Sequence, residues 1–429
     1  MGSRRPTGCP RSLVLLLLVL LPALALGQGG GRRAYTFLDL PVSPRLTGLG
    51  GKAPALFRAV DPGLAVFNPA LADAEIHNRL ELGASLYFAD IVFNHAAYFR
   101  ATPRVGTYGL GVRQVWYGRF DGRTPTGAPD GSFTAYDMAL SAYYSRSLLP
   151  GLRAGLSVNP ILSRIESYNS LALTADLGLL YSHADGVVQT GLVVRNLGGT
   201  LIPYHKSYTA APVDVTLGWS FTLQHAPLRF LLTLQHLENI NYRYIREEAH
   251  SSSYMVVDPN REEPKWWQQL LQELVAHPVL GVEIAPMRYF YLQLGYNAHR
   301  AQEMALKGHY AFEGLSYGLG VNIQRFSLNF ARSHYHAHGA TNHLSVSLRF
   351  GRTEPAAVRE RPIWGRVEPV PSRADGGQEA REEVEETTGE VVEVPREAEV
   401  EEPDEVQHGV PEMPEEAEGP SAENEPENE

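Results

Sequence analysis

The 429-residue sequence contains a single cysteine, Cys9. Cys9 lies in an N-terminal segment that we expect to be removed, so the mature chain would lack a disulfide framework, thiol chemistry and a lipid-modified N-terminal cysteine. Beyond that segment the sequence has no run of about 18 continuous apolar residues, which is what a transmembrane helix needs. An exported chain of this kind is periplasmic, secreted, or inserted in a membrane as a β-barrel.

Signatures of catalysis are also missing. The glycines at 48–51 lack the Lys-Ser/Thr pair of a phosphate-binding loop, and we interpret them as a tight turn. No nucleophile-elbow motif is present, and candidate Ser, His and Asp residues are scattered. We therefore expect a protein that is not an enzyme, with no cofactor, no bound metal and no nucleic-acid partner.

The first 27 residues have the features of a signal peptide. A basic stretch with three arginines precedes an apolar run of about nine residues at 13–21, and Ala25-Leu26-Gly27 offers small residues for cleavage. This apolar run is too short for a retained membrane anchor, which requires about 20 residues. We expect cleavage after residue 27, so that the mature chain begins at Gln28.

Charge divides the sequence into two parts. Residues 351–429 hold 25 of the 48 acidic residues but only 7 of the 37 Lys and Arg, a net charge of −18. This segment is rich in Glu and Pro and poor in aromatic residues, so it cannot bury enough apolar surface to offset the entropy of ordering it. We predict a disordered acidic C-terminal tail over 351–429, with a solvated spacer as its simplest role.

Alternation of apolar and polar residues dominates the region from Leu80 to Phe350. In 213–224 and 315–323 every second residue is large and apolar, and the residues between them are mainly Ser, Thr, Asn, Gln and Gly. This period of two predicts strands of a sheet with two unlike faces. A soluble β-sandwich is the alternative, but its polar face would normally carry more Lys and Glu.

The same pattern predicts about 14 strands of an all-β, antiparallel transmembrane β-barrel over residues 79–350. Short turns alternate with longer links at 118–134, 197–211, 238–278 and 298–313, as periplasmic turns and external loops do in outer-membrane barrels. An even number of strands puts both barrel ends, and hence the acidic tail, in the periplasm. The expected strands lie near residues 80–87, 91–100, 105–117, 135–145, 152–163, 171–183, 187–196, 212–224, 228–237, 279–286, 289–297, 314–324, 326–333 and 342–350.

Residues 28–78 precede the barrel and do not alternate. They mix turn formers with apolar residues, as in Asn68-Pro69-Ala70. A compact segment of this kind suits an ordered hatch, or plug, in the lumen of a barrel.

A family resemblance covers most of residues 35–350. The run Tyr35 to Leu71 resembles the N-terminal signature of the PorV/PorQ family of outer-membrane barrels, which is similar to the fatty-acid transporter FadL in its 14 strands and its Asn-Pro-Ala hatch motif. Further matches, closest to the PorQ group, lie at 192–198, 226–230, 292–297 and 338–343. The acidic tail goes beyond this family's pattern, so the resemblance says nothing about its role.

The resemblance implies a role in the type IX secretion system. A barrel of this family would sit in the outer membrane and anchor a surface-exposed protein that processes or attaches secreted cargo. The alternative is a FadL-like transporter of hydrophobic small molecules. Similar barrels host both roles, so the fold alone does not choose between them.

One external link contains a candidate partner surface. Apolar residues recur at helical spacing between Pro264 and Pro278, and Trp266 and Trp267 lie at the start of this stretch. The stretch either packs over the mouth of the barrel or docks a protein or a glycolipid such as lipopolysaccharide, with the two tryptophans as anchors.

Histidines gather in the last hairpin. His334, His336 and His338 would share one face of a strand, with His343 across the loop, a geometry that suits a metal ion. No Cys is available and no Asp or Glu lies nearby. We therefore interpret these histidines as polar residues that line the mouth of the lumen.

Overall fold

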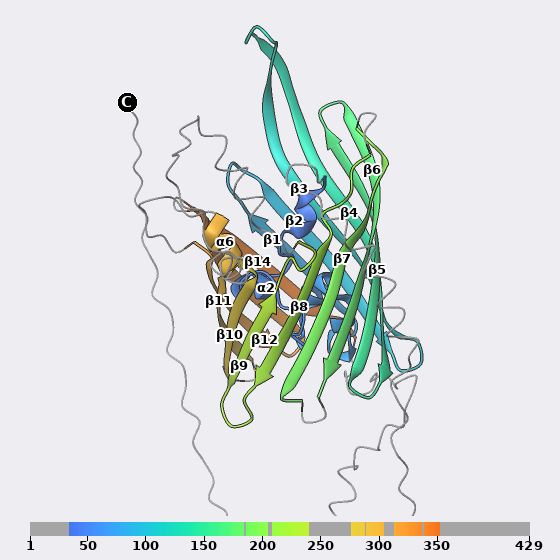
Figure 1. Ribbon diagram of the computed structural model, residues 1–429, viewed down its shortest axis with the longest axis vertical. Coiled ribbons are helices and arrows are strands. Elements are labelled where there is room, and N and C mark those ends of the chain that lie inside the picture. The colour runs from blue at the N-terminus through green and yellow to red at the C-terminus, as the bar shows by residue number, and fades with distance from the viewer. Residues whose placement is uncertain are drawn as a thin grey trace, which may run out of the picture. The chain divides into compact units, whose positions relative to one another are not determined.

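The computed structural model describes residues 34–183, 186–204, 208–239, 276–287, 289–303, 313–336 and 339–351. Its strands form a closed barrel in which each strand pairs antiparallel with its sequence neighbours and β14 pairs with β1 (Figure 1). The predicted closed barrel of 14 antiparallel strands is confirmed. The strands are β1 (Arg79–Leu86), β2 (Val92–Thr102), β3 (Gly106–Arg123), β4 (Pro129–Leu149), β5 (Leu152–Ile165), β6 (Tyr168–Ser182), β7 (Val188–Ile202), β8 (Asp214–Thr222), β9 (Leu228–Leu234), β10 (Pro278–Met287), β11 (Phe290–Asn297), β12 (Leu315–Ile323), β13 (Phe326–His336) and β14 (Gly339–Arg349).

Short helices form the segment ahead of the barrel, and Ser-Pro and Asn-Pro pairs start two of them. The side chain of Ser43 caps α2 and that of Asn68 caps η3, and each cap is followed by a proline whose fixed φ suits the first helical position. No helix in the described ranges is long and apolar enough to cross a bilayer. The helices are η2 (Thr36–Asp39), α2 (Pro44–Gly48), α3 (Pro62–Phe67), η3 (Pro69–Leu71), η4 (Ala74–Ile76) and, after β11, α6 (Ala298–Glu303).

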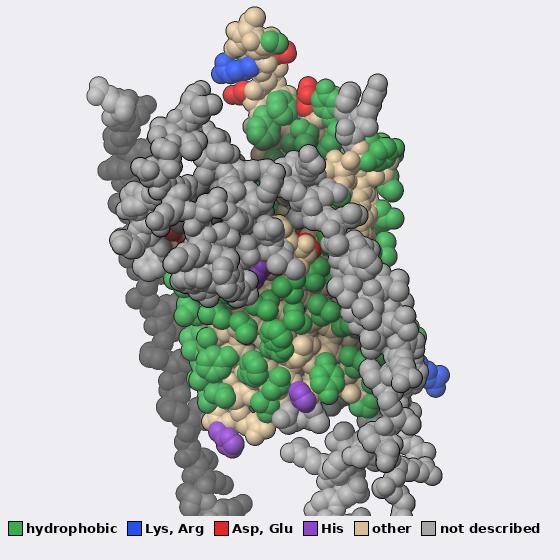
Figure 2. Space-filling view, viewed as in Figure 1, with side chains coloured by type: hydrophobic (Ala, Val, Ile, Leu, Met, Phe, Trp, Pro, Cys, Tyr) green, Lys and Arg blue, Asp and Glu red, His purple; other side chains and the backbone are tan. Residues whose placement is uncertain are grey.

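The outer face of the barrel wall is apolar and the inner face is largely polar, which is the reverse of a soluble protein. In β11, Leu292 and Leu294 point outward and stay 41% and 53% exposed, whereas Gln293 between them points inward and is buried. Hydrophobic side chains cover the barrel face seen in Figure 2. An apolar exterior on a closed ring of strands fits the hydrocarbon interior of a bilayer, where every backbone hydrogen bond must be made internally.

The hatch fills the lumen with its own apolar core. Leu46, Leu49 and Leu64 are fully buried and cluster with Leu180 and Val193 of the wall. Apolar residues of the hatch therefore face wall residues at the few inward positions that are not polar. The interior combines this small core with buried polar and charged groups.

Wall glycines allow the hatch to approach closely. A Cβ atom on Gly155 of β5 would overlap the hatch backbone at Pro69 and Ala70, and one on Gly191 of β7 would overlap the carbonyl of Pro54. Because only glycine lacks a Cβ, these positions let the backbone of the hatch lie directly against the strands.

Strands β3 and β4 continue past the rest of the barrel as a hairpin, which rises highest in the view of Figure 1. The expected loop at 118–134 is wrong, because all of these residues except the turn at 124–128 extend the two strands. The expected loop at 197–211 is also wrong in its first part, since β7 continues to Ile202. Outside the bilayer the strands no longer need an apolar face, so the alternation that marked them in the sequence fades before they end.

Candidate functional site

The hatch motif Asn68-Pro69-Ala70 lies at the hatch–wall contact. The side chain of Asn68 is fully buried and makes two hydrogen bonds: its Oδ1 accepts from the backbone N of Ala70 at 3.0 Å, and its Nδ2 donates to the carbonyl of Pro54 at 2.8 Å. Asn68 therefore ties two turns of the hatch together. Its role in the described structure is to shape the hatch.

The other residues singled out in the sequence are two tryptophans and the histidines of the last hairpin. Trp266 and Trp267 lie outside the described residues. His334 lies beside the outward-facing Tyr317, with ring centroids 6.2 Å apart, whereas His343 points inward and accepts or donates a hydrogen bond with Ser85 at 2.6 Å. The interpretation that these histidines line the lumen mouth together is therefore wrong for His334, because the two side chains lie on opposite faces of the wall.

The structure instead brings charged residues of the hatch and the wall together in two clusters. In the first, the Arg45 cluster, the Arg45 guanidinium donates from Nε and Nη2 to the two carboxylate oxygens of Glu283 on β10, each at 2.9 Å, and from Nη1 to Asp61 at 2.6 Å. Glu283 also accepts from Arg229 at 3.2 Å and from Gln293 at 3.0 Å. This two-pronged arrangement is the strongest form of an arginine–carboxylate contact.

Burial and the neighbouring charges shift the pKa of Arg45 in opposite directions. Burial alone would lower the pKa of its guanidinium, but Glu283, Tyr291 and Asp61 raise that pKa well above the usual value. Arg45 also lies over the ring of Tyr291, 4.1 Å from its centroid. The cation of α2 is thus fixed in one geometry against β10.

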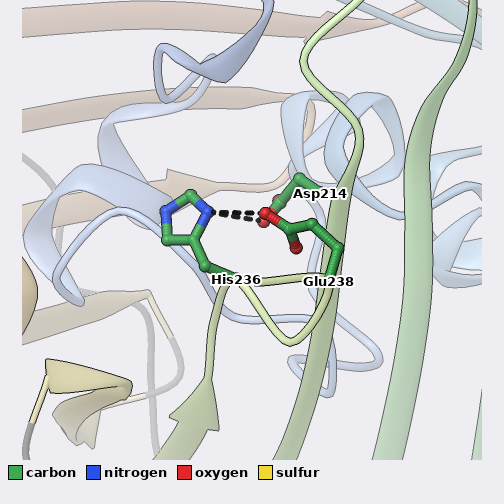
Figure 3. A group of neighbouring side chains, drawn as sticks. All are labelled: Asp214, His236 and Glu238. Atoms are coloured by element: carbon green, nitrogen blue, oxygen red, sulfur yellow. Dashed lines mark hydrogen bonds and ion pairs between the residues drawn. The ribbon is translucent and has the colours of Figure 1, made fainter. Parts of the chain in front are cut away.

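The second cluster, the Lys52 cluster, lies at the end of the barrel where β8 begins and β9 ends. Lys52 of the hatch donates to Asp214 Oδ1 at 2.7 Å and lies 3.4 Å from His236 Nε2. The other ring nitrogen of His236, Nδ1, lies 3.4 Å from Asp214 Oδ1 and 3.3 Å from Glu238 Oε1 (Figure 3). Asp214 comes from the start of β8, whereas His236 and Glu238 come from the loop that follows β9.

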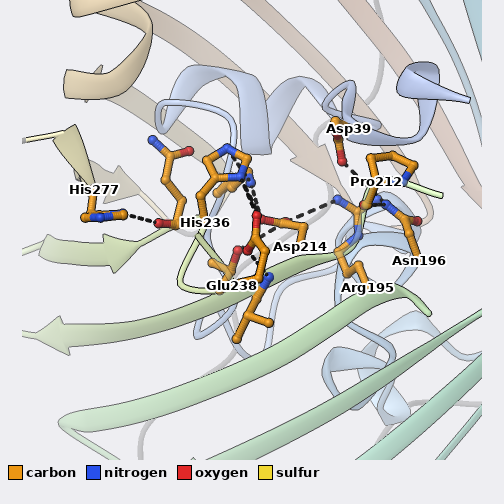
Figure 4. Close-up of polar contacts among 12 residues, drawn as sticks. Asp39, Arg195, Asn196, Pro212, Asp214, His236, Glu238 and His277 are labelled. Atoms are coloured by element: carbon orange, nitrogen blue, oxygen red, sulfur yellow. Dashed lines mark hydrogen bonds and ion pairs between the residues drawn. The ribbon is translucent and has the colours of Figure 1, made fainter. Parts of the chain in front are cut away.

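Further polar residues surround the Lys52 cluster (Figure 4). Arg195 on β7 lies 4.0 Å from Asp214 and donates to the carbonyl of Leu38 in the hatch at 2.7 Å. Asp39 faces the same region and lies 3.4 Å from the side-chain amide nitrogen of Asn196. Burial, and then the neighbouring charge of Asp214, raise the pKa of the Asp39 carboxyl. The hatch is therefore held at this end by a mixed set of charges.

A third feature is the hairpin extension, residues 118–133. The last pair that β3 makes with β2 is Trp116 with Val92, and the first pair between β4 and β5 is Ala135 with Ile165. Beyond these points the two strands pair only with each other, and the rings of Phe120 and Phe133 stack with centroids 5.2 Å apart. Both outer edges of the extension lack a strand partner among the described residues.

Arg113 on β3 is the most unusual inward-facing residue. It is 2% exposed, and in the described part of the chain none of its three guanidinium nitrogens has a hydrogen-bond acceptor. The hydroxyls of Tyr143 and Ser141 on the neighbouring strand are also buried. Tyr143 packs in the apolar cluster that contains Phe99, with ring centroids 5.3 Å apart. All three side chains occupy buried, inward positions of the wall.

Sequence reasoning did not find the charged clusters, since their members are far apart in the chain. Lys52 and Asp214 are separated by 162 residues, and Arg45 and Glu283 by 238. One signal was available: charged residues such as Asp214 and Glu283 stand at inward positions of predicted strands whose other inward residues are neutral or glycine.

No family model matches the sequence, and no curated protein matches it. Among solved structures, the chain is similar to the toluene transporter TodX of Pseudomonas putida, with a TM-score of 0.43, 12% identity and coverage of 74% of this chain and 100% of that one. It is similar to the CymD monoaromatic hydrocarbon channel, with a TM-score of 0.43, 12% identity and coverage of 73% and 99%. A FadL homologue of Pseudomonas aeruginosa gives a TM-score of 0.41, 10% identity and coverage of 72% and 98%. TM-scores of this size do not indicate what the present chain binds.

Proposed function

We propose that this protein is an outer-membrane barrel that anchors a surface protein of a type IX secretion system, and that the hairpin extension is its docking element. The observation that carries the proposal is the free-standing pairing of residues 118–133. The family resemblance of residues 35–350 supplies the secretion system.

A two-stranded hairpin is only marginally stable in water when it stands alone, so an extension of this length gains stability from a partner. Each arm continues about six residues past its last contact with the wall, roughly 20 Å at about 3.3 Å per residue. The unpaired edges offer backbone N–H and C=O groups to an added strand, which is a common way for one protein to bind another.

The edges are selective. The register between β3 and β4 shifts between Trp116 and Arg119 and again between Asp121 and Arg123, and these charged side chains are exposed. Bulges and charges discourage indiscriminate strand pairing. They favour a partner whose own charges match.

The hatch supports an anchoring role in a second way. Buried ion pairs and wall glycines hold it in the lumen, so the barrel as described is closed by its own chain. In this proposal the hairpin extension faces the outside of the cell, and the short turns at the opposite end, together with the acidic tail, face the periplasm, as in other barrels with an even number of strands.

Removing the extension tests the proposal. Trp116 pairs with Tyr136, so Tyr117 and Ala135 are the next residues in that register, and replacing residues 118–134 with Asn-Gly joins them through a two-residue turn. We expect the shortened barrel to stay in the membrane with heat-modifiable migration, while its surface partner appears in the medium.

The matched control changes the extension without removing it: Pro125→Ala and Thr126→Ala alter the exposed tip of the hairpin, and we expect the partner to stay cell-bound. If the shortened barrel folds and retains its partner in full, the extension is not the docking element. If it releases nothing but loses uptake of a hydrophobic solute, the anchor function itself is wrong.

The transporter alternative rests on a different observation, the three guanidinium nitrogens of Arg113, which have no acceptor among the described residues. A hydrophobic compound with a polar oxygen would satisfy them. Uptake measured in Arg113→Gln, with the hairpin extension intact, tests this alternative: loss of uptake with retention of the surface partner favours transport, and unchanged uptake removes its support.

A further inference from the structure

The spacing inside the Lys52 cluster matches a metal site more closely than a hydrogen-bonded group. His236 Nδ1 lies 3.3 Å from Glu238 Oε1 and 3.4 Å from Asp214 Oδ1, which is long for a hydrogen bond from a ring nitrogen. Ligands about 2.0–2.2 Å from a tetrahedral zinc ion lie about 3.4 Å from one another. All three ligand atoms fall within 4.8 Å of one another.

We propose that Asp214, His236 and Glu238 form a binding site for a divalent transition-metal ion of the zinc class. One imidazole and two carboxylates are a ligand set that zinc accepts, with a fourth position for water. The site is separate from the histidines of the last hairpin, and it departs from the expectation that the chain binds no metal. It does not depend on the anchoring role.

The second oxygen of each carboxylate is held in place. Glu238 Oε2 accepts a hydrogen bond from the backbone N of Val215 at 2.9 Å, and Asp214 Oδ2 accepts one from Thr216 at 3.2 Å. Such outer contacts orient the ligating oxygens of metal sites. Only the remaining oxygen of each group points at His236.

The backbone of His236 also suggests a constrained position. Its φ angle is 56°, a left-handed conformation that costs energy in a residue with a side chain. Strain of this kind is kept where the surrounding structure fixes a side chain for a function. The imidazole of His236 lies beside both carboxylates.

In the described structure the positive charge beside Asp214 and His236 is the ammonium of Lys52. This ammonium donates to Asp214 Oδ1, the oxygen that a metal would take, and lies 3.4 Å from His236 Nε2. A metal ion bound to Asp214 Oδ1 would compete with the Lys52 ammonium for the same oxygen, and the two positive charges would repel each other. Metal binding therefore displaces Lys52 from Asp214 and loosens the hatch, and an intact Lys52 contact weakens metal binding by the same factor.

Zinc titration calorimetry on the folded full-length chain in detergent tests the site. The experiment uses a background in which His334, His336 and His338 are all changed to Ala, so that the hairpin histidines do not contribute. We expect one Zn²⁺ per chain, and a loss of affinity of about a hundredfold or more in His236→Ala and in Glu238→Gln. The control His183→Ala removes an exposed histidine from a turn at the other end of the barrel and should bind as the background does.

Removing Lys52 gives a second test, in which zinc affinity should rise where the ligand substitutions lower it. Lys52→Met removes the ammonium and should strengthen zinc binding about tenfold or more, whereas Lys52→Arg keeps the charge and should not. Tetrahedral cobalt(II) absorption should appear in the background chain and be lost in His236→Ala. Equal zinc affinity in the background chain, His236→Ala and Glu238→Gln, each shown to be folded by heat-modifiable migration, would overturn the site. Unchanged affinity in Lys52→Met would overturn the competition.

Discussion

The hatch and the hairpin extension are both additions to the same barrel wall, and their contacts differ in kind. The hatch lies inside, where Arg45 meets Glu283 through two hydrogen bonds and the backbone lies against wall glycines. The extension lies outside, where residues 118–133 pair with one another and both edges are unmatched. The hatch is bonded to other parts of the chain, whereas the edges of the hairpin extension have no strand partner among the described residues.

This difference separates the structural role of the hatch from the binding role proposed for the hairpin extension. Buried charges that lose one partner keep the full cost of their desolvation, so the hatch is expensive to move. Exposed backbone groups at a strand edge are solvated and cost little until a partner arrives. Substitutions in the hatch should therefore change the stability of the whole barrel, and substitutions in the extension should change it little.

The largest loss of barrel stability is expected from the substitution Arg45→Met. This change leaves Glu283 and Asp61 buried without their main cation, and the loss of one partner of a buried pair costs about 3–5 kcal/mol. Unfolding by denaturant in detergent should show it as a large fall in the midpoint. The control is Arg229→Met, which removes a single contact to Glu283 from a side chain that is 19% exposed, and should cost clearly less. Equal losses would mean that the two-pronged contact does not hold the hatch.

A smaller loss is expected from Gly155→Ala, because the added Cβ overlaps the hatch backbone at Pro69 and Ala70. Overpacking of this kind costs about 1–3 kcal/mol. The same denaturant midpoint measures it. Leu156→Ala on the adjacent outward position serves as the control, since its side chain does not contact the hatch side of the strand. An unchanged unfolding midpoint in Gly155→Ala would show that the hatch backbone can move away from the added Cβ atom.

Phe133→Ala should weaken only the extension. Loss of its stacking with Phe120 removes about 0.5–1.5 kcal/mol beyond the buried area, and this applies to the hairpin alone. Limited trypsin digestion should cut faster at the exposed Arg123, while the unfolding midpoint of the barrel stays at the wild-type value. A shift of that midpoint as large as for Gly155→Ala would contradict the independence of the two regions.

The smallest effect is a pH dependence at the foot of the hatch. Burial lowers the pKa of His77 below its ordinary value of 6.5, and its Nδ1 lies 2.9 Å from the carbonyl of Ala101. Because the folded chain favours neutral His77, this contribution to stability is complete above about pH 6.5 and is lost as the pH falls through the lowered pKa. The midpoint of the wild type should therefore fall more than that of His77→Gln between pH 7 and pH 5. Parallel pH profiles would exclude His77 as the cause.

Much of the wall could be predicted from the sequence, because a bilayer demands strict alternation. The run from Leu315 to Ile323 was predicted from its apolar spacing, and it forms β12. The same rule failed at 118–134, where the strands leave the bilayer and exposed polar residues such as Ser132 carry no periodic signal. Strand ends outside the membrane are set by pairing, which a local pattern does not encode.

The charged clusters could not be predicted for another reason. Neither Lys52 nor His236 stands in a local motif, and their side chains meet only because the hatch is enclosed by the closed wall. Asp214 falls within the expected strand 212–224, but its partners Lys52 and His236 lie 162 and 22 residues away along the chain. Such contacts follow from the three-dimensional closure of the sheet.

The pairing of β1 with β14 has a consequence for the order of assembly. The ring is completed only when Arg79 meets Arg349 in the ladder, so the strand that closes the barrel is the last of the fourteen to leave the ribosome. The hatch, in contrast, precedes β1 and is present from the start, and its contact from Arg45 reaches 238 residues along the chain. Pairings this distant make folding slow. The hatch is therefore made first and enclosed last, because the pairing of β1 with β14 completes the ring around a segment that precedes it in the chain.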